Sequence, residues 1–163
     1  LEPIPTVIFG GVVFCQFFNN HIEDFDDESL DPGIVQFLSE SKGSESAVVI
    51  TAFRLPSSIV QQGYNLKKLS VLRKVNKKRI KTIAEFKDAM TKEINKYVKN
   101  EKHRYIELEI GGTVNEIIYV DLELVFKLEP MLYCTPGYKR ECSLVKIDML
   151  QTRKRSFDTI SQK

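Results

Sequence analysis

FGGVVF, residues Phe9 to Phe14, is the stretch around which we expect the chain to be organised. Gly10 and Gly11 allow a tight turn and leave backbone amides unshielded by side chains, and the apolar residues after them are typical of a buried strand. Such a loop can hold a carboxylate, and the strand behind it can accept an added peptide strand. The alternative is an ordinary turn before a core strand, which these six residues taken alone favour. The sequence downstream decides how much weight the binding interpretation receives.

Length and composition indicate one folded core with an extension. At 163 residues the chain is long enough to bury a core, whereas two full domains would be cramped. A hydrophobic content of 42% with 28% charged residues is ordinary for a soluble globular protein, and no apolar run approaches the ~18 residues of a membrane span. The opening residues, LEPIPTV, lack the features of a secretory signal. We therefore expect no membrane partner and a chain that is a fragment of a longer protein.

The three cysteines are too few and too scattered for a disulfide framework. A reducing intracellular compartment or organelle is favoured over secretion. Cys15, within a strand pattern, is predicted to be a small core side chain. A turn would place Cys134 and Cys142 on neighbouring strands, but with only His21 and His103 available the usual zinc ligand clusters are missing. We expect no metal and no cofactor.

The formal net charge of +2 hides a strong segregation of charge along the chain. Glu23–Glu45 holds eight acidic residues against one lysine, and Lys67–Arg104 holds fourteen basic residues against four acidic ones. The two segments are expected to attract each other. The basic run lacks the interleaved aromatic residues of a nucleic-acid site, so a solvated face is favoured over nucleic-acid binding.

Apolar patterns and turn residues predict the elements of the first half of the chain. Val7–Gln16 is predicted to be a strand interrupted at the two glycines, with a heavy aromatic load. Residues 19–46 are predicted to form an acidic loop and an inserted short helix over Asp31–Lys42. A strand over Ala47–Ala52 follows, and then a short helix within PSSIVQQGY that ends at Gly63.

One long helix is predicted with its capping residues. Thr82 and Glu85 form a capping box, and apolar residues then recur at helical spacing over Thr82–Lys99. A strand over Leu69–Val75 and a turn at Asn76 come before it. The apolar face, which is expected to pack towards the sheet, comprises Ile83, Phe86, Met90, Ile94, Tyr97 and Val98.

Two hairpins are predicted after the long helix. RYIELEI, Arg104–Ile110, alternates strictly, Gly111 and Gly112 are predicted to form a two-residue turn, and Asn115–Phe126 is predicted to be the partner strand. A second hairpin is predicted around Thr135–Tyr138, and the polar residues after it are expected to form a flexible tail.

The ordered set of these segments resembles a PDZ domain over roughly Pro5–Val125. The features that carry the resemblance are FGGVVF, the inserted helix before AVVITAF, the segment PSSIVQQGY, the run VNKKRIKTIAEFKDAM and the hairpin RYIELEIGG. The chain is most similar to the PDZ-like domain that lies C-terminal to the protease domain in Deg/HtrA (DegP-type) serine proteases, and within them to the second PDZ domain of the plant-type Deg branch.

The resemblance implies an α+β fold. This is a PDZ-like, partly open β-barrel or sandwich of about five to seven strands, with two main helices and an inserted short helix. Residues 1–128 would form the PDZ-like domain, with the acidic loop and inserted helix at 19–46. Residues 129–163 would form the C-terminal hairpin and flexible tail.

The resemblance also implies a peptide-binding groove between the strand after the diglycine and the long helix. Gly10 stands where the family has a large apolar residue, and NLKK replaces the family's Pro-Gly-Asp turn, so ordinary binding of C-termini is expected to be altered. The residues expected to bind peptide are Gly10, Gly11, Val12, Val13 and Phe14 from the loop and strand, and Phe86 and Met90 from the helix.

No catalytic residue is expected in this chain. The Gly-Asn-Ser-Gly-Gly-Pro stretch of the proteases is missing, and neither histidine lies in a triad-like context. The resemblance implies a non-catalytic regulatory domain of a serine endopeptidase of protein quality control. It would bind peptide or protein segments by strand addition, possible partners being its own protease domain or a neighbouring PDZ domain, and would help a homo-oligomer to assemble or gate the protease. The alternatives are a stand-alone module for free C-termini and, ranked last, a basic nucleic-acid-binding domain.

Overall fold

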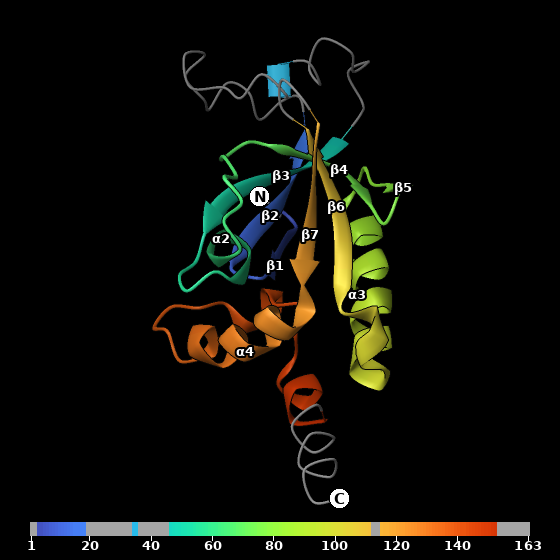
Figure 1. Ribbon diagram of the computed structural model, residues 1–163. Helices are drawn as coiled ribbons and strands as arrows, with labels where there is room; N and C mark the ends of the chain where they lie inside the picture. The colour runs from blue at the N-terminus through green and yellow to red at the C-terminus, as the bar shows by residue number, and fades with distance from the viewer. Residues whose placement is uncertain (1–2, 19–33, 36–45, 112–114, 153–163) are drawn as a thin grey trace, which may run out of the picture.

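The computed structural model describes residues 3–18, 34–35, 46–111 and 115–152. Their strands form one open, seven-stranded sheet in the order β1-β2-β3-β4-β6-β7, with β5 paired to β4. All neighbouring strands are antiparallel. Figure 1 shows α3 lying along one side of the sheet and α4 at the end where β7 finishes. The expected α+β, PDZ-like fold is confirmed, and the sheet does not close into a barrel.

The elements up to β6 occur in the predicted order. The strands are β1 (Thr6–Phe9), β2 (Val12–Phe18), β3 (Ser46–Phe53), β4 (Val71–Val75), β5 (Lys78–Arg79), β6 (Tyr105–Gly111) and β7 (Glu116–Asp121). The helices are α2 (Ser58–Gln61), α3 (Ile83–Lys99) and α4 (Leu122–Tyr133), with 3-10 turns η3 (Glu101–His103) and η4 (Arg140–Cys142). Residues 147–152 are also helical.

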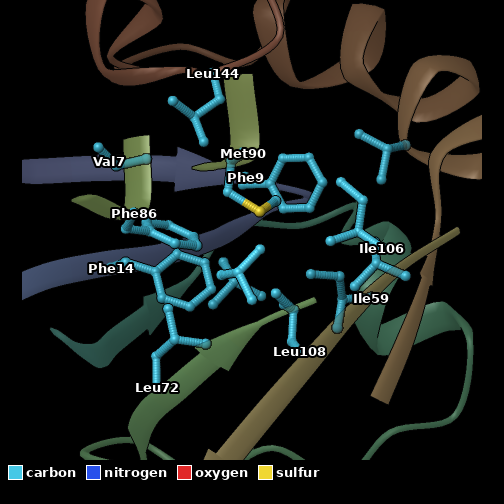
Figure 2. Close-up of a cluster of buried hydrophobic side chains, with 14 of the residues drawn as sticks. Val7, Phe9, Phe14, Ile59, Leu72, Phe86, Met90, Ile106, Leu108 and Leu144 are labelled. Carbon is cyan, nitrogen blue, oxygen red and sulfur yellow. The ribbon is translucent and has the colours of Figure 1, made fainter. Parts of the chain in front are cut away.

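Helix α3 begins and packs as its sequence predicts. The Thr82 hydroxyl accepts a hydrogen bond from the Glu85 amide at 3.1 Å, and the Glu85 carboxylate accepts one from the Lys81 amide at 2.8 Å. The first contact satisfies an amide that the first helical turn leaves unpaired, and the second fixes the residue before the cap. Figure 2 shows Phe86 and Met90 reaching into the core. The centroids of the Phe86 and Phe14 rings lie 4.7 Å apart. The face buried against the sheet comprises Ile83, Phe86, Met90, Ile94 and Tyr97.

A smaller cluster covers the other face of the sheet. Ile34 is fully buried there against Phe17 of β2 and Val49 of β3. Ile34 and Val35 are the only part of the predicted inserted helix that the structure describes, and both are helical. The rest of that helix and the acidic loop, residues 19–33 and 36–45, lie outside the described residues, as does the expected attraction between the acidic and basic segments.

The predicted strand over Asn115–Phe126 is wrong in its second half. β7 ends at Asp121, whose carboxylate caps α4 by accepting a hydrogen bond from the Glu123 amide at 3.0 Å. The Val and Phe residues of this segment favour a strand, yet its apolar positions recur at helical spacing. These positions are buried: Leu122, Val125, Phe126, Leu128, Leu132 and Tyr133. Helix α4 therefore crosses residue 128, where the sequence places the end of the PDZ-like domain.

Two predicted turns also differ from the structure. Ile110 pairs with Glu116, so the connection between β6 and β7 is longer than two residues; Gly111 belongs to β6, and Gly112 lies outside the described residues. The hairpin around Thr135–Tyr138 is replaced by the end of α4, a turn at Gly137 with φ +78°, and η4. Cys134 and Cys142 therefore do not lie on paired strands. Among the described residues, no helix is long and apolar enough to cross a bilayer.

Candidate functional site

The diglycine forms the turn of a tight hairpin. Phe9 pairs with Val12 across Gly10 and Gly11, and the pairing continues to Thr6 and Cys15. Both glycines have positive φ, +58° and +78°. Two consecutive positive φ values define a type I′ turn, whose twist matches that of the flanking strands, and glycine adopts them without steric cost. The predicted interruption of the strand is thus a reversal of the chain.

The turn is buried against α2 and does not form an open cradle for a carboxylate. The Gly10 carbonyl accepts a hydrogen bond from the Ser57 hydroxyl at 2.7 Å, and the Gly11 carbonyl accepts one from the Arg54 amide at 2.6 Å. A Cβ on Gly10 would lie 2.9 Å from the side chain of Ile59. The two glycines are therefore needed for close packing on α2.

The structure brings the predicted strand and helix residues together, but as core. Val12, Phe14, Phe86 and Met90 are each 0% exposed, and Val13 is 7% exposed. Figure 2 shows Phe14 and Phe86 facing each other with Met90 beside them. Peptide binding between β2 and α3 by these residues stays a prediction, and in the described structure their side chains pack against one another.

The edge of β2 that a peptide would use is occupied by β1. β2 pairs with β3 on one side and with β1 on the other, and the pairing with β1 is extended by a hydrogen bond from the Gln16 amide to the Pro5 carbonyl at 3.1 Å. Helix α3 packs on β1 as well as on β2. β1 buries Val7, Ile8 and Phe9, each at most 4% exposed. The chain thus provides its own added strand.

The segment after α4 forms backbone contacts with β1. The Leu144 amide donates a hydrogen bond to the Ile8 carbonyl at 3.0 Å, and Ser143 forms a parallel bridge with Ile8. Ser143 is tied to α4 because its hydroxyl donates to the Glu129 carboxylate at 2.6 Å. The Tyr138 hydroxyl donates to the same carboxylate at 2.9 Å. Burial raises the pKa of Glu129 above its ordinary value, and the two hydrogen bonds offset part of that rise.

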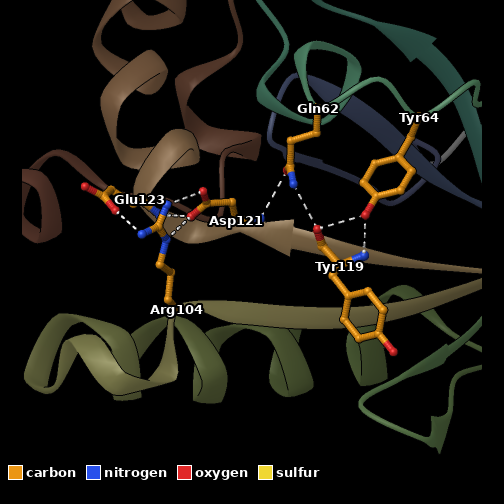
Figure 3. A network of polar contacts seen from close by, with 6 residues as sticks. All are labelled: Gln62, Tyr64, Arg104, Tyr119, Asp121 and Glu123. Carbon is orange, nitrogen blue, oxygen red and sulfur yellow. Dashed lines mark hydrogen bonds and ion pairs between the residues drawn. The ribbon is translucent and has the colours of Figure 1, made fainter.

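The edge of the sheet opposite β1 is formed by β7, and side chains cover part of it. The Gln62 amide group donates to the Tyr119 carbonyl at 2.9 Å and accepts from the Asp121 amide at 3.1 Å. The Tyr64 hydroxyl accepts from the Tyr119 amide at 3.0 Å, as Figure 3 shows. These two side chains take the place of a further strand along Tyr119–Asp121, which protects that part of the edge from other chains.

An ion-pair group fixes β7 to α4. Arg104 donates to both oxygens of Asp121, at 2.8 and 2.7 Å, and its third nitrogen lies 2.8 Å from the Glu123 carboxylate (Figure 3). The hydrogen bonds from Arg104 hold the pKa of Asp121 below its ordinary value. Asp121 therefore stays ionised to more acidic pH, and its negative charge is favourable at the N-terminus of α4. In the part of the chain that the structure describes, no group of His, Cys, Asp and Glu side chains is placed to hold a metal ion.

Sequence reasoning missed the residues that hold the β1 edge and the β7 edge. Glu129 lies on the buried face of α4, and an acidic residue at a core position of a helical pattern is the signal that identifies it. That signal is visible only once the segment is tested for helical spacing. Gln62 and Tyr64 carry no signal in the sequence, because their partners are backbone groups of a distant strand.

The comparisons with known proteins agree with the geometry. No curated protein matches the sequence. The family described as the PDZ domain matches residues 4–125. The matched range runs from β1 through the first residues of α4, so it contains the hairpin, the whole sheet and α3. By this match and by its fold, the chain belongs to the PDZ domain family.

Proposed function

We propose that this chain is the non-catalytic regulatory PDZ domain of a Deg/HtrA-type serine endopeptidase, where it mediates assembly or gating of the protease. A PDZ domain is a module that binds peptide or protein segments and has no catalytic role. One observation supports a role in assembly or gating over capture of free peptides. It is the pairing of β2 with β1 on the edge that a peptide would use. The sequence resemblance supports the protease parent and the plant-type Deg branch.

A free peptide competes poorly with a strand of the same chain. A tethered segment acts at an effective concentration of ~1 mM. If a free peptide and β1 each bound the edge with an intrinsic Kd of ~1 µM, the tethered strand would raise the apparent Kd of the peptide about a thousandfold. The contacts of Ser143 and Leu144 with Ile8 stabilise β1 further. The residues Gly10, Gly11, Val12, Val13, Phe14, Phe86 and Met90 therefore serve peptide binding only when β1 leaves.

The proposed partners are other parts of the same assembly. They are the protease domain, a neighbouring PDZ domain and further copies of the chain. Cys15, Cys134 and Cys142 are free, which supports a reducing compartment or organelle. The alternative, a stand-alone module for free C-termini, would need an open β2 edge. No observation favours nucleic-acid binding.

The proposal is tested on the native protein. Antibodies raised against this chain should isolate a polypeptide larger than 18.8 kDa that reacts with a fluorophosphonate probe of serine hydrolases. Removal of this chain from that polypeptide should change the mass of the assembly and leave the labelling of the catalytic serine in place. An isolated polypeptide that does not react with the probe would reject the protease parent.

A further inference from the structure

A groove lined mostly by residues that follow the range matched by the PDZ family lies between α4, the end of α3 and the helical residues 147–152. Figure 1 shows α4 and this last helical segment at the same end of the molecule. The groove has a volume of about 690 Å³, within the range of ligand sites in proteins. Its walls are largely apolar and come from Tyr97, Phe126, Pro130, Tyr133, Ile147 and Leu150. We name it the α4 groove.

Two basic side chains line the α4 groove. Lys127 and Arg140 line the groove, and neither forms an ion pair with a carboxylate among the described residues. Glu123, the acidic residue that lines the groove, lies 2.8 Å from Arg104, which also pairs with Asp121. Arg140 is held in place because its guanidinium donates to the Tyr133 carbonyl at 2.7 Å. An occupant that matches this site carries apolar side chains and several carboxylates.

The sequence contains one segment with this chemistry. Ile22–Asp31 has six carboxylates, no basic residue, and three large apolar residues, Ile22, Phe25 and Leu30. The basic segment Lys67–Arg104 contributes Tyr97 to the wall of the groove. Apolar and electrostatic complementarity therefore point to the same occupant.

The geometry favours a second copy as the source of that segment. The strands that flank the segment are attached near the start of α3, since the Gln16 side chain accepts from the Ile83 amide and the Ser46 hydroxyl donates to the Lys81 carbonyl. The groove lies near Tyr97, about 21 Å further along the helix at 1.5 Å per residue. Phe25 is seven residues after Phe18, a reach of about 23 Å only at full extension. Docking within one chain would use nearly all of that reach, whereas a second copy faces no such limit.

We infer that the α4 groove binds the acidic segment Ile22–Asp31 of a second copy of this chain. Phe25 and its apolar neighbours enter the groove, and the carboxylates face Lys127 and Arg140. The inference rests on the proposed function in one respect, that the domain mediates assembly, and it names the surface and the segment that join the copies.

The first test uses a fluorescent peptide of residues 21–32, HIEDFDDESLDP, titrated into the full 163-residue chain. We expect saturable binding that weakens as salt is raised, because the contacts are partly ionic. Lys127→Glu should weaken binding about tenfold, and Ile147→Ser should weaken it severalfold, since Ile147 is exposed and lines the groove. The matched controls Lys139→Glu and Met131→Ser change exposed residues outside the groove and should leave binding unchanged. A peptide with all acidic residues replaced by their amides should bind more weakly.

The second test follows sedimentation of the whole chain. Lys127→Glu should shift the equilibrium towards monomer, and adding Asp26→Lys and Asp27→Lys should restore association. Absence of peptide binding, or binding and assembly that ignore Lys127→Glu, would overturn the inference. A chain that assembles through another surface would leave the proposed function standing. Failure of the native polypeptide to react with fluorophosphonate would reject the protease parent without affecting peptide binding to the α4 groove.

Discussion

At Gly11 the backbone of the hairpin passes so close to α2 that no side chain fits. A Cβ there would lie 2.5 Å from the Arg54 carbonyl oxygen and 2.7 Å from the Ser57 Cα, and φ is +78°. Gly11→Ala should therefore lower the free energy of unfolding by ~3 kcal/mol or more, from backbone strain and overlap together. Gly63→Ala is the matched control, because Gly63 also has positive φ, +89°, but nothing lies within 4 Å of an added Cβ. It should cost only about 1 kcal/mol in urea denaturation. Equal losses in the two variants would show that the hairpin does not pack on α2.

Glu129 is the residue whose ionisation is expected to affect stability most clearly. It is 1% exposed and its pKa is raised, chiefly by burial. Between the ordinary value of 4.5 and its raised pKa, the folded state binds more protons than the unfolded state. This group's contribution to stability is therefore largest below pH 4.5 and is lost as pH rises through the folded pKa. Glu129→Gln should raise the melting temperature at pH 8 relative to the native chain and give less or no gain at pH 5. A gain that is the same at both pH values would show that Glu129 titrates normally.

Single residues could be predicted from the sequence where the requirement is local. The need for glycine at positions 10 and 11 and the capping pair Thr82 and Glu85 follow from turn and helix geometry alone. Ser57 and Glu129 could not be assigned their roles in this way. Each acts on a group that is distant in the sequence, the Gly10 carbonyl and the Ser143 hydroxyl.

At the scale of elements, α3 is the helix whose packing makes the sharpest prediction. Phe86 is 0% exposed and its ring contacts Phe14 across the helix–sheet interface. Phe86→Ala should cost about 3–5 kcal/mol through lost burial and the cavity left behind. The neighbouring exposed residue gives the control, since Lys87→Ala should change stability by at most about 0.5 kcal/mol. An unchanged melting curve for Phe86→Ala would mean that α3 presents its other face to the sheet.

The elements up to β6 were predictable and α4 was not, for a physical reason. In α3 the spacing of apolar residues, the capping box and the length all favour a helix. In α4 the Val and Phe residues favour a strand, and the preceding strand β7 runs into it without a glycine or proline. Asp121 is the one stop signal, and its carboxylate both caps α4 and accepts a hydrogen bond from Arg104. The element that frames the α4 groove was therefore missed together with the groove.

At the scale of the whole molecule, β1 covers one edge of β2 and two further parts of the chain hold β1 in place. β1 pairs with β2, the Ser143–Leu144 segment bonds to β1, and Glu129 of α4 bonds to Ser143. The sequence predicted that the strand after the diglycine could accept an added peptide strand. It did not place β1 beside that strand, because four apolar residues such as TVIF are compatible with any neighbouring strand.

The central claim is that β1 fills the edge of β2 in solution, and Thr6 and Cys15 offer its most direct test. They are directly opposite in the hairpin, and the Thr6 hydroxyl lies 3.3 Å from the Cys15 sulfur. Thr6→Cys, in a chain with Cys134→Ser and Cys142→Ser, should form a disulfide with Cys15 that locks β1 in place. The measurement is the titration of the oxidised and reduced forms with peptides that end in a free carboxylate. We predict ready formation of the disulfide and no micromolar binding by either form. A disulfide that does not form, or micromolar binding by the reduced chain that is lost on oxidation, would contradict the account.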